Sequence, residues 1–172
     1  RIASKDWVTV SQEGIEPVSV GRFYVHTATN RGDIPEGARA FRIDAGLAFG
    51  TGQHETTTGC LATLDLLRAR GTRVRNLLDL GTGTGLLAFA ALHLWPRAAA
   101  IASDIDPVAI DVTRENAERN GVPLGDGVGE LDLVVAAGMA HPLLQARAPY
   151  DLIIANVLAG PLIDMAPSIA DA

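Results

Sequence analysis

The alternation of strand and helix patterns after residue 75 constrains the fold of this chain more than any other feature. Apolar runs that suit strands buried on both faces are separated by stretches with helical punctuation. This order is typical of a mostly parallel sheet with helices on both faces, so the sequence predicts an α/β fold. The expected strands span 76–80, 98–103, 131–135 and 151–155, and the expected helices span 86–95, 107–120, 142–146 and 161 to the end.

The third helix of this chain has the clearest predicted ends. Asp106 is expected as its N-cap, Pro107 occupies the first helical position, and Gly121 lies just past the end. These residue types suit their positions: the aspartate supplies a capping oxygen, the proline needs no N–H hydrogen bond in the first turn, and the glycine can adopt the left-handed conformation that ends a helix. Both boundaries can therefore be predicted from the sequence.

Residues 1–43 show alternation in place of helical periodicity. Short apolar runs at 7–10, 18–20, 23–25 and 40–43 are separated by glycine and proline, which predicts short antiparallel strands. A glycine-rich loop at 46–52 follows, and the next helix is expected to begin near Glu55, with threonines 56–58 as possible caps. We expect residues 1–43 to be a linker with leading strands and residues 44–172 to form the ligand-binding domain.

Composition excludes several classes of function. Twenty acidic and 14 basic residues give a net charge of −6, which disfavours a surface that tracks a nucleic-acid backbone. Cys60 is the only cysteine and the four histidines lack ligand spacing, so we expect a reducing cytoplasmic location and no metal. The longest apolar stretch, 86–95, is too short to cross a membrane. The chain begins without methionine or a signal peptide, and we expect it to be a piece of a longer protein.

A glycine-rich loop, Asp79 to Gly85, follows the first strand of the α/β region and precedes a helix. Loops in this position lie at the carboxyl edge of the sheet, where open α/β folds bind ligands. A dinucleotide fingerprint would need glycine at the position of Leu86, so the pattern is instead similar to the nucleoside-binding loop of class I methyltransferases. A tight turn without a ligand is the alternative. The candidate cofactor-binding residues here are Asp79, Gly81, Thr82, Gly83 and Gly85.

Two further strand ends supply polar candidates. Asp104 ends the second strand and could accept hydrogen bonds from both ribose hydroxyls of a nucleoside, with Ile105 beside it. Asn156 follows the fourth strand, and its amide oxygen could accept a proton from an attacking amine and align the amine for displacement. The alternatives are a solvated strand end for Asp104 and a turn residue for Asn156.

Several motifs together resemble the family of ribosomal protein L11 methyltransferases of the PrmA type, from about Val20 to the end. The segments that carry the resemblance are 46–57, 79–85, 104–107, 115–121 and 155–161. The resemblance implies a Rossmann-like class I methyltransferase fold, S-adenosylmethionine as cofactor, and cofactor contacts from Thr57, Gly81, Asp104 and Asn156. It also implies an N-terminal recognition domain and C-terminal sheet strands beyond this chain.

The loop ahead of the domain departs from the family pattern in two places. The family has proline where this chain has Ala45 and Glu55, so we expect this loop to be less rigid than the family pattern implies. His54 matches the family, and it could orient the substrate or pin the loop.

The resemblance further implies transfer of methyl groups to lysine and N-terminal amines of ribosomal protein L11, repeated to trimethylation. It implies no direct contact with nucleic acid. Methylation of another protein lysine or of a small molecule is an alternative, as is a nucleoside-binding fragment without catalysis. Glutamine-modifying relatives are disfavoured because they carry Asn-Pro-Pro-Tyr where this chain has Asn-Val-Leu-Ala, at 156–159. A nicotinamide-binding dehydrogenase is a weaker alternative.

Overall fold

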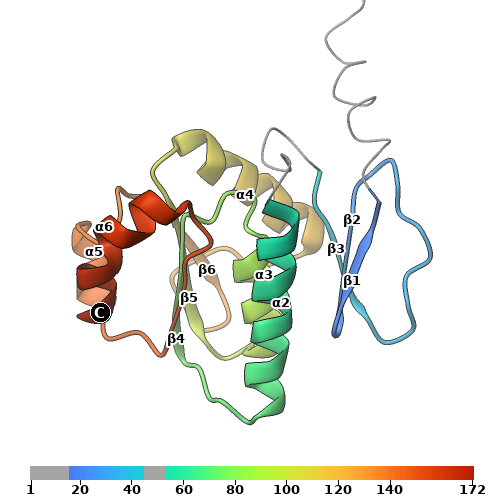
Figure 1. Cartoon of the computed structure of the whole chain (residues 1–172), viewed down its shortest axis with the longest axis horizontal. Helices are drawn as coiled ribbons and strands as arrows, with labels where there is room; N and C mark the ends of the chain where they lie inside the picture. The colour runs from blue at the N-terminus through green and yellow to red at the C-terminus, as the bar shows by residue number, and fades with distance from the viewer. Residues whose placement is uncertain (1–15, 45–52) are drawn as a thin grey trace, which may run out of the picture.

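The computed structural model describes residues 16–44 and 53–172, with side chains from residue 55 onward in the second range. Two sheets are formed, a small one near the N-terminus and a larger one surrounded by helices (Figure 1). The expected strand at 7–10, the glycine-rich loop at 46–52 with Ala45, and the side chain of His54 lie outside the described residues. No helix in the described ranges is long and apolar enough to cross a membrane.

The larger sheet is entirely parallel and has the strand order β6-β5-β4-β7. The chain moves outward from β4 through β5 to β6, and then returns to the other side of β4 to add β7. The strand order therefore reverses at β4, and such a point is where open α/β sheets bind ligands, beyond the carboxyl ends of the strands. The strands are β4 (Asn76–Leu80), β5 (Ala99–Asp104), β6 (Leu131–Val135) and β7 (Leu152–Ile154).

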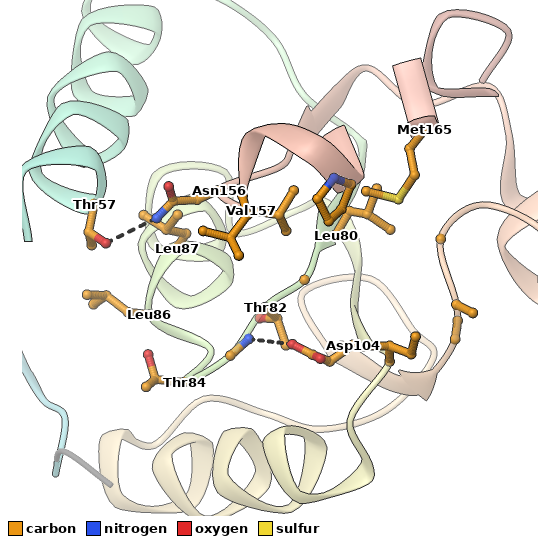
Figure 2. A pocket seen from close by; sticks show the side chains of 18 of the residues that line it. Thr57, Leu80, Thr82, Thr84, Leu86, Leu87, Asp104, Asn156, Val157 and Met165 are labelled. Carbon is orange, nitrogen blue, oxygen red and sulfur yellow. Dashed lines mark hydrogen bonds between the residues drawn. The ribbon is translucent and has the colours of Figure 1, made fainter. Parts of the chain in front are cut away.

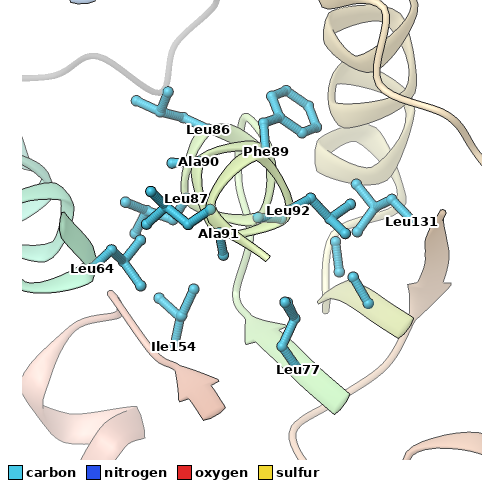
Figure 3. Close-up of a cluster of buried hydrophobic side chains, with 14 of the residues drawn as sticks. Leu64, Leu77, Leu86, Leu87, Phe89, Ala90, Ala91, Leu92, Leu131 and Ile154 are labelled. Atoms are coloured by element: carbon cyan, nitrogen blue, oxygen red, sulfur yellow. The ribbon is translucent and has the colours of Figure 1, made fainter. Parts of the chain in front are cut away.

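Helices cover both faces of this sheet. On one face α3 is buried along almost its whole length, and the side chains of α2 and α4 join it in one apolar cluster (Figure 3). On the other face α5 and α6 pack over a second cluster that contains Leu78, Ile101 and Leu144. The expected α/β fold with a parallel sheet is thereby confirmed. The helices are α2 (Gln53–Ala69), α3 (Leu86–Leu94), α4 (Pro107–Asn120), α5 (Pro142–Arg147) and α6 (Ala159–Ala170).

The small sheet has the order β1-β2-β3, formed by β1 (Val18–Val20), β2 (Phe23–His26) and β3 (Arg39–Arg42). β1 and β2 are antiparallel, as expected, but β3 runs parallel to β2, so the prediction of antiparallel strands throughout was wrong. Parallel neighbours need a long connection, and residues 27–38 supply one. The glycines and proline of this segment are also compatible with a turn between antiparallel strands, which is why the sequence suggested that pairing. Phe41 of β3 packs near Phe89 of α3, with ring centroids 6.3 Å apart, which joins the sheet to the main core.

The predicted ends of α4 are confirmed. The carboxylate of Asp106 accepts a hydrogen bond from the backbone N–H of Val108 at 2.9 Å, and Gly121 is left-handed with φ 64°. The start of α2 was placed too late, because the helix begins at Gln53 and threonines 56–58 lie inside it. These threonines are therefore not N-caps, although the threonine pattern suggested it.

Candidate functional site

The loop between β4 and α3 requires glycine at two of its positions. Gly81 has φ 72° and Gly85 has φ 86°, conformations that other residues adopt only with strain. A Cβ atom on Gly81 would lie 2.3 Å from a methyl of Val157, and one on Gly85 would lie 2.4 Å from the ring of Phe89. The backbone can therefore pass close under Val157 only because side chains are absent.

Main-chain hydrogen bonds attach this loop to the end of β5. The N–H groups of Gly81 and Thr82 donate to the carbonyl of Ser103 at 2.8 and 2.9 Å. The N–H of Gly83 donates to the Asp104 carboxylate at 2.9 Å. The first two strand ends of the α/β region are thus held together, and the loop is fixed by the protein itself.

Two buried side chains of α4 hold the other side of the loop. The Thr113 hydroxyl donates to the carbonyl of Gly83 at 3.1 Å, and the Asn116 amide donates to the carbonyl of Thr84 at 3.0 Å. Both side chains are fully buried. Neither residue was predicted to have a role. Their spacing was a usable signal, because two polar residues three positions apart lie on the face of α4 that also presents Ile110 and Ala117.

Asp79, a candidate cofactor ligand, lies beneath the loop and does not line the cavity described below. It is 1% exposed, and the Thr82 hydroxyl donates to its carboxylate at 2.7 Å. Burial raises the pKa of Asp79 to about 6, and the nearby Asp104 carboxylate adds to the increase. Hydrogen bonds from Thr82 and from the N–H of Ala88 oppose it. In this structure Asp79 supports the loop from below.

Asp104 lies at the rim of the cavity with capacity to bind a further group. One carboxylate oxygen accepts from Gly83, and the other accepts from the N–H of Asp106 at 3.0 Å. Each oxygen has two acceptor positions, so each can still accept a hydroxyl donor. Ile105, next to Asp104, is 72% exposed and presents an apolar surface to the same cavity.

Asn156 and Thr57 lie on the side of the cavity opposite Asp104, and their side chains contact each other (Figure 2). The Asn156 side-chain N–H donates to the Thr57 hydroxyl at 3.1 Å, which joins the end of β7 to α2. The amide oxygen of Asn156 is then left to accept a hydrogen bond from another molecule, since no hydrogen bond engages it within the described part of the chain. Thr57 lies in the interior of α2 and acts here through its side chain.

These groups surround one cavity of about 720 Å³ beyond the carboxyl ends of β4, β5 and β7. Its volume is in the range of small-molecule sites. Seven of the nine candidate cofactor-binding residues line it, and Asp79 and Gly85 do not. The seven are Thr57, Gly81, Thr82, Gly83, Asp104, Ile105 and Asn156.

Much of the remaining lining is apolar. It includes Leu86, Leu87, Val157, Leu158 and Met165, none of which was predicted to belong to the site. Apolar walls with a few polar groups suit a ligand that has a flat ring and a polar sugar. In the described ranges no three side chains of histidine, cysteine, aspartate or glutamate are grouped to hold a metal ion.

Comparison with known proteins decides the family. The family model described as Ribosomal protein L11 methyltransferase (PrmA) matches residues 1–172. The chain belongs to this family. A ribosomal protein L11 methyltransferase of Brucella suis is 46% identical over 166 residues, which are 96% of this chain and 56% of that protein. The corresponding protein of Sinorhizobium fredii is 49% identical over 164 residues, 95% of this chain and 54% of its own length.

One solved structure agrees with membership of the PrmA family, and a second shares the fold alone. A crystal structure of ribosomal protein L11 methylase from Lactobacillus delbrueckii subsp. bulgaricus has a TM-score of 0.69 and 30% identity, covering 91% of this chain and 74% of that one. A precorrin-6y C5,15-methyltransferase from Geobacter metallireducens, with a TM-score of 0.53 and 18% identity, shares the fold over 74% of this chain and 60% of that one. The fold is therefore that of class I methyltransferases. The chain spans about half the length of the curated PrmA relatives that it matches.

Proposed function

We propose that this chain is the cofactor-binding and catalytic part of a methyltransferase that transfers methyl groups from S-adenosylmethionine to amines of ribosomal protein L11. Residues 44–172 would form the S-adenosylmethionine-binding domain, and residues 1–43 would be the linker with its leading strands. A ribosomal protein as substrate implies a cytoplasmic location. The proposal combines membership of the PrmA family with the geometry of the cavity.

The observation that supports this function best is the grouping of three strand ends around one cavity. The glycine loop after β4, Asp104 after β5 and Asn156 after β7 all border it. This arrangement offers bare main chain, a hydroxyl acceptor and an amide to a single ligand. A nucleoside with a charged methyl donor at its other end fits such a set of groups.

In the proposed complex, Gly81, Thr82 and Gly83 would contact the ligand through the main chain. Asp104 would accept the ribose hydroxyls with the acceptor positions that Gly83 and Asp106 leave open. Ile105 would pack on the adenine ring, since its exposed side chain borders the cavity. Asp79 and Gly85 would act indirectly, by fixing the loop.

The catalytic role falls to Asn156. When bound, S-adenosylmethionine would supply an activated methyl group, so the protein would have to hold a neutral amine in line through a hydrogen bond, and the methylated ammonium product would then lose its proton to solvent. A lysine amine is protonated at neutral pH, with a reference pKa of about 10.4, and the apolar walls would favour its neutral form. The amide oxygen of Asn156 is available for the amine N–H because the amide nitrogen is engaged by Thr57.

Binding of S-adenosylhomocysteine to this chain, measured by calorimetry, tests the proposal. We expect saturable binding with one site, and weak or no binding of NAD. Tight NAD binding without a response to S-adenosylhomocysteine would refute the methyltransferase assignment. The substrate is tested separately, by mass spectrometry of ribosomal protein L11 after incubation with the full-length enzyme and labelled cofactor. Label on lysine and N-terminal amines is expected, and an unlabelled protein would refute the substrate.

A further inference from the structure

A second hollow lies away from the cofactor cavity, between the small sheet and the C-terminal end of α4. Its volume is about 430 Å³, and it is lined by four arginines, Arg31, Arg39, Arg42 and Arg119, together with His26 and Asn120. Asn120 joins its two sides, because the Asn120 side chain accepts from the N–H of Arg42 at 2.8 Å and donates to the Arg42 carbonyl at 2.8 Å.

The two sites lie at opposite ends of α4. Asp104 and Ile105 precede the helix and border the cofactor cavity, whereas Arg119 and Asn120 end it and border the basic hollow. The helix has 14 residues, so at 1.5 Å per residue the two sites are about 20 Å apart. The hollow is therefore not an extension of the proposed nucleoside site.

Four arginines in one place are unexpected in a chain with a net charge of −6. Arg42 forms an ion pair with Asp44 at 2.7 Å, and Arg119 forms one with Glu115 at 2.9 Å. Within the described ranges no carboxylate forms an ion pair with Arg31 or Arg39. Four guanidinium charges and two paired carboxylates leave a local charge of about +2.

Three of the arginines are held in place by the protein. Arg39 donates to the carbonyl of Asn120 at 2.9 Å and stacks on the ring of Phe41 at 5.1 Å from its centroid. The Nε of Arg39 is buried and has no partner among the described residues, so this side chain has unused donor capacity. Arg42 donates its Nε and Nη2 to the Asp44 carboxylate, and Arg119 donates its Nη1 to Asn116 and its Nη2 to Glu115, so hydrogen bonds orient both of these guanidinium groups. Guanidinium groups that are already oriented lose little entropy when an oxyanion binds.

The electrostatic surroundings agree with an excess of positive charge. Burial raises the pKa of Asp44, but hydrogen bonds from Arg42 and from the N–H of Ala28, with the charges of Arg42 and Arg119, lower it overall. Burial lowers the pKa of His93, and the positive charges of Arg39 and Arg22 lower it further. Positive charges from the turn before β2, from β3 and from α4 thus act on the ionisable groups of this part of the structure.

We propose that this hollow is a binding site for a phosphate group, with Arg31, Arg39, Arg42 and Arg119 as its ligands. A phosphate monoester has a charge of about −1.5 to −2 at pH 7, which matches the unpaired positive charge of the site. Planar guanidinium forks are suited to bidentate contacts with phosphate oxygens. The site is independent of the proposed methyl transfer, and the phosphate can be free or part of a small phosphorylated molecule.

The test is a titration of the full chain with inorganic phosphate, followed by amide signals in nuclear magnetic resonance at constant ionic strength. We expect saturable shifts of the amides of Ala28, Arg42 and Asn120, while those of Gly81 and Gly83 stay in place. Sodium chloride at the same ionic strength should produce no such shifts. Absence of saturable shifts at tens of millimolar phosphate would overturn the proposal, and so would equal shifts with chloride.

A matched pair of variants tests the arginines. Arg31 is exposed and its side chain makes no hydrogen bond or ion pair in the described part of the chain, so Arg31→Gln should fold normally. It should weaken phosphate binding roughly three- to tenfold. Arg70→Gln changes an exposed arginine just after the end of α2 and should leave binding unchanged. Equal affinities in Arg31→Gln and the parent chain would overturn the assignment.

Two further ligands identify the source of the phosphate. Ribose 5-phosphate should bind as inorganic phosphate does or more tightly, whereas ribose alone should not bind. Single-stranded RNA and polyglutamate are tested in the same way. If either polymer shifts the same amides and phosphate does not displace it, the proposal is overturned in favour of a macromolecular partner. Titration with S-adenosylhomocysteine reports on the other cavity, so failure of one site is distinguishable from failure of the other.

Discussion

Substitution of Asp79 by asparagine should remove a component of the pH dependence of stability. The Asp79 carboxyl is buried beneath the glycine loop, and burial raises its pKa to about 6 from the ordinary value of 3.8. Because the folded state binds this proton more tightly than the unfolded state, the group favours folding at low pH. That contribution is complete below about pH 3.8 and is lost as the pH rises through about 6.

The magnitude follows from the two pKa values. A difference of about two pKa units, at 1.36 kcal/mol per unit, corresponds to roughly 3 kcal/mol between the two ends of this range. Asparagine cannot ionise, so Asp79→Asn should lack this component. We compare the free energies of unfolding of the parent chain and the variant. The parent value minus the variant value should therefore fall by roughly 3 kcal/mol as the pH rises from about 4 to 7.

Urea unfolding at several pH values, followed by circular dichroism, measures this difference. Asp111→Asn is the matched control, because Asp111 is an exposed aspartate of α4, and its difference from the parent chain should vary little with pH. A parent-to-variant difference that stays constant across pH 4 to 7 would refute the assignment of the raised pKa to Asp79. A difference that increases with pH would show that the carboxylate is stabilised in the folded state.

Three other substitutions test the proposed site. Asp104→Ala should weaken S-adenosylhomocysteine binding in calorimetry by about 1–3 kcal/mol through lost hydrogen bonds. Asp106→Ala should cost about 1 kcal/mol of stability by loss of a cap and leave affinity nearly unchanged, so equal affinities of the two variants would remove Asp104 from the site. Asn156→Ala in the full-length enzyme should lower kcat more than cofactor affinity, and equal losses would contradict a role in alignment. Gly81→Ala should lower the free energy of unfolding, measured by thermal unfolding, by at least about 1–2 kcal/mol. Gly59→Ala, in open space on α2, should raise it by about 0.5–1 kcal/mol. The opposite order would contradict the argument that Gly81 requires glycine.

The main sheet and α4 could be predicted because their signals are local. The cap, the proline and the glycine around α4 fix its ends independently of the rest of the chain. The direction of β3 could not be predicted in this way. Whether a strand pairs parallel or antiparallel depends on the path of its connection, and glycines and prolines in residues 27–38 are compatible with both.

The candidate site was predictable to the extent that it depends on strand ends. Parallel strands end at a common edge, so Asp104 and Asn156 had to lie near the glycine loop once their strands were recognised. The hydrogen bonds of Thr113 and Asn116 to that loop depend on how α4 packs, which is a tertiary property. For the same reason, the sequence could not show that Asp79 faces the underside of the loop.

The hydrogen bonds of the loop also bear on which nucleoside ligand it can accept. Loops that bind a pyrophosphate present free N–H groups and the start of a helix to the phosphates. Here the N–H groups of Gly81, Thr82 and Gly83 already donate to the end of β5, and that of Gly85 donates to the carbonyl of Thr82.

The start of α3 is occupied as well. The Asp79 carboxylate accepts the N–H of Ala88 in the first turn of this helix, where a phosphate would otherwise bind. A second carboxylate, Asp104, lies close enough to raise the pKa of Asp79. A pyrophosphate would meet two acids and few free donors, whereas a nucleoside without phosphate needs only the open acceptor positions of Asp104 and the apolar walls. The geometry of this loop therefore favours S-adenosylmethionine over a dinucleotide.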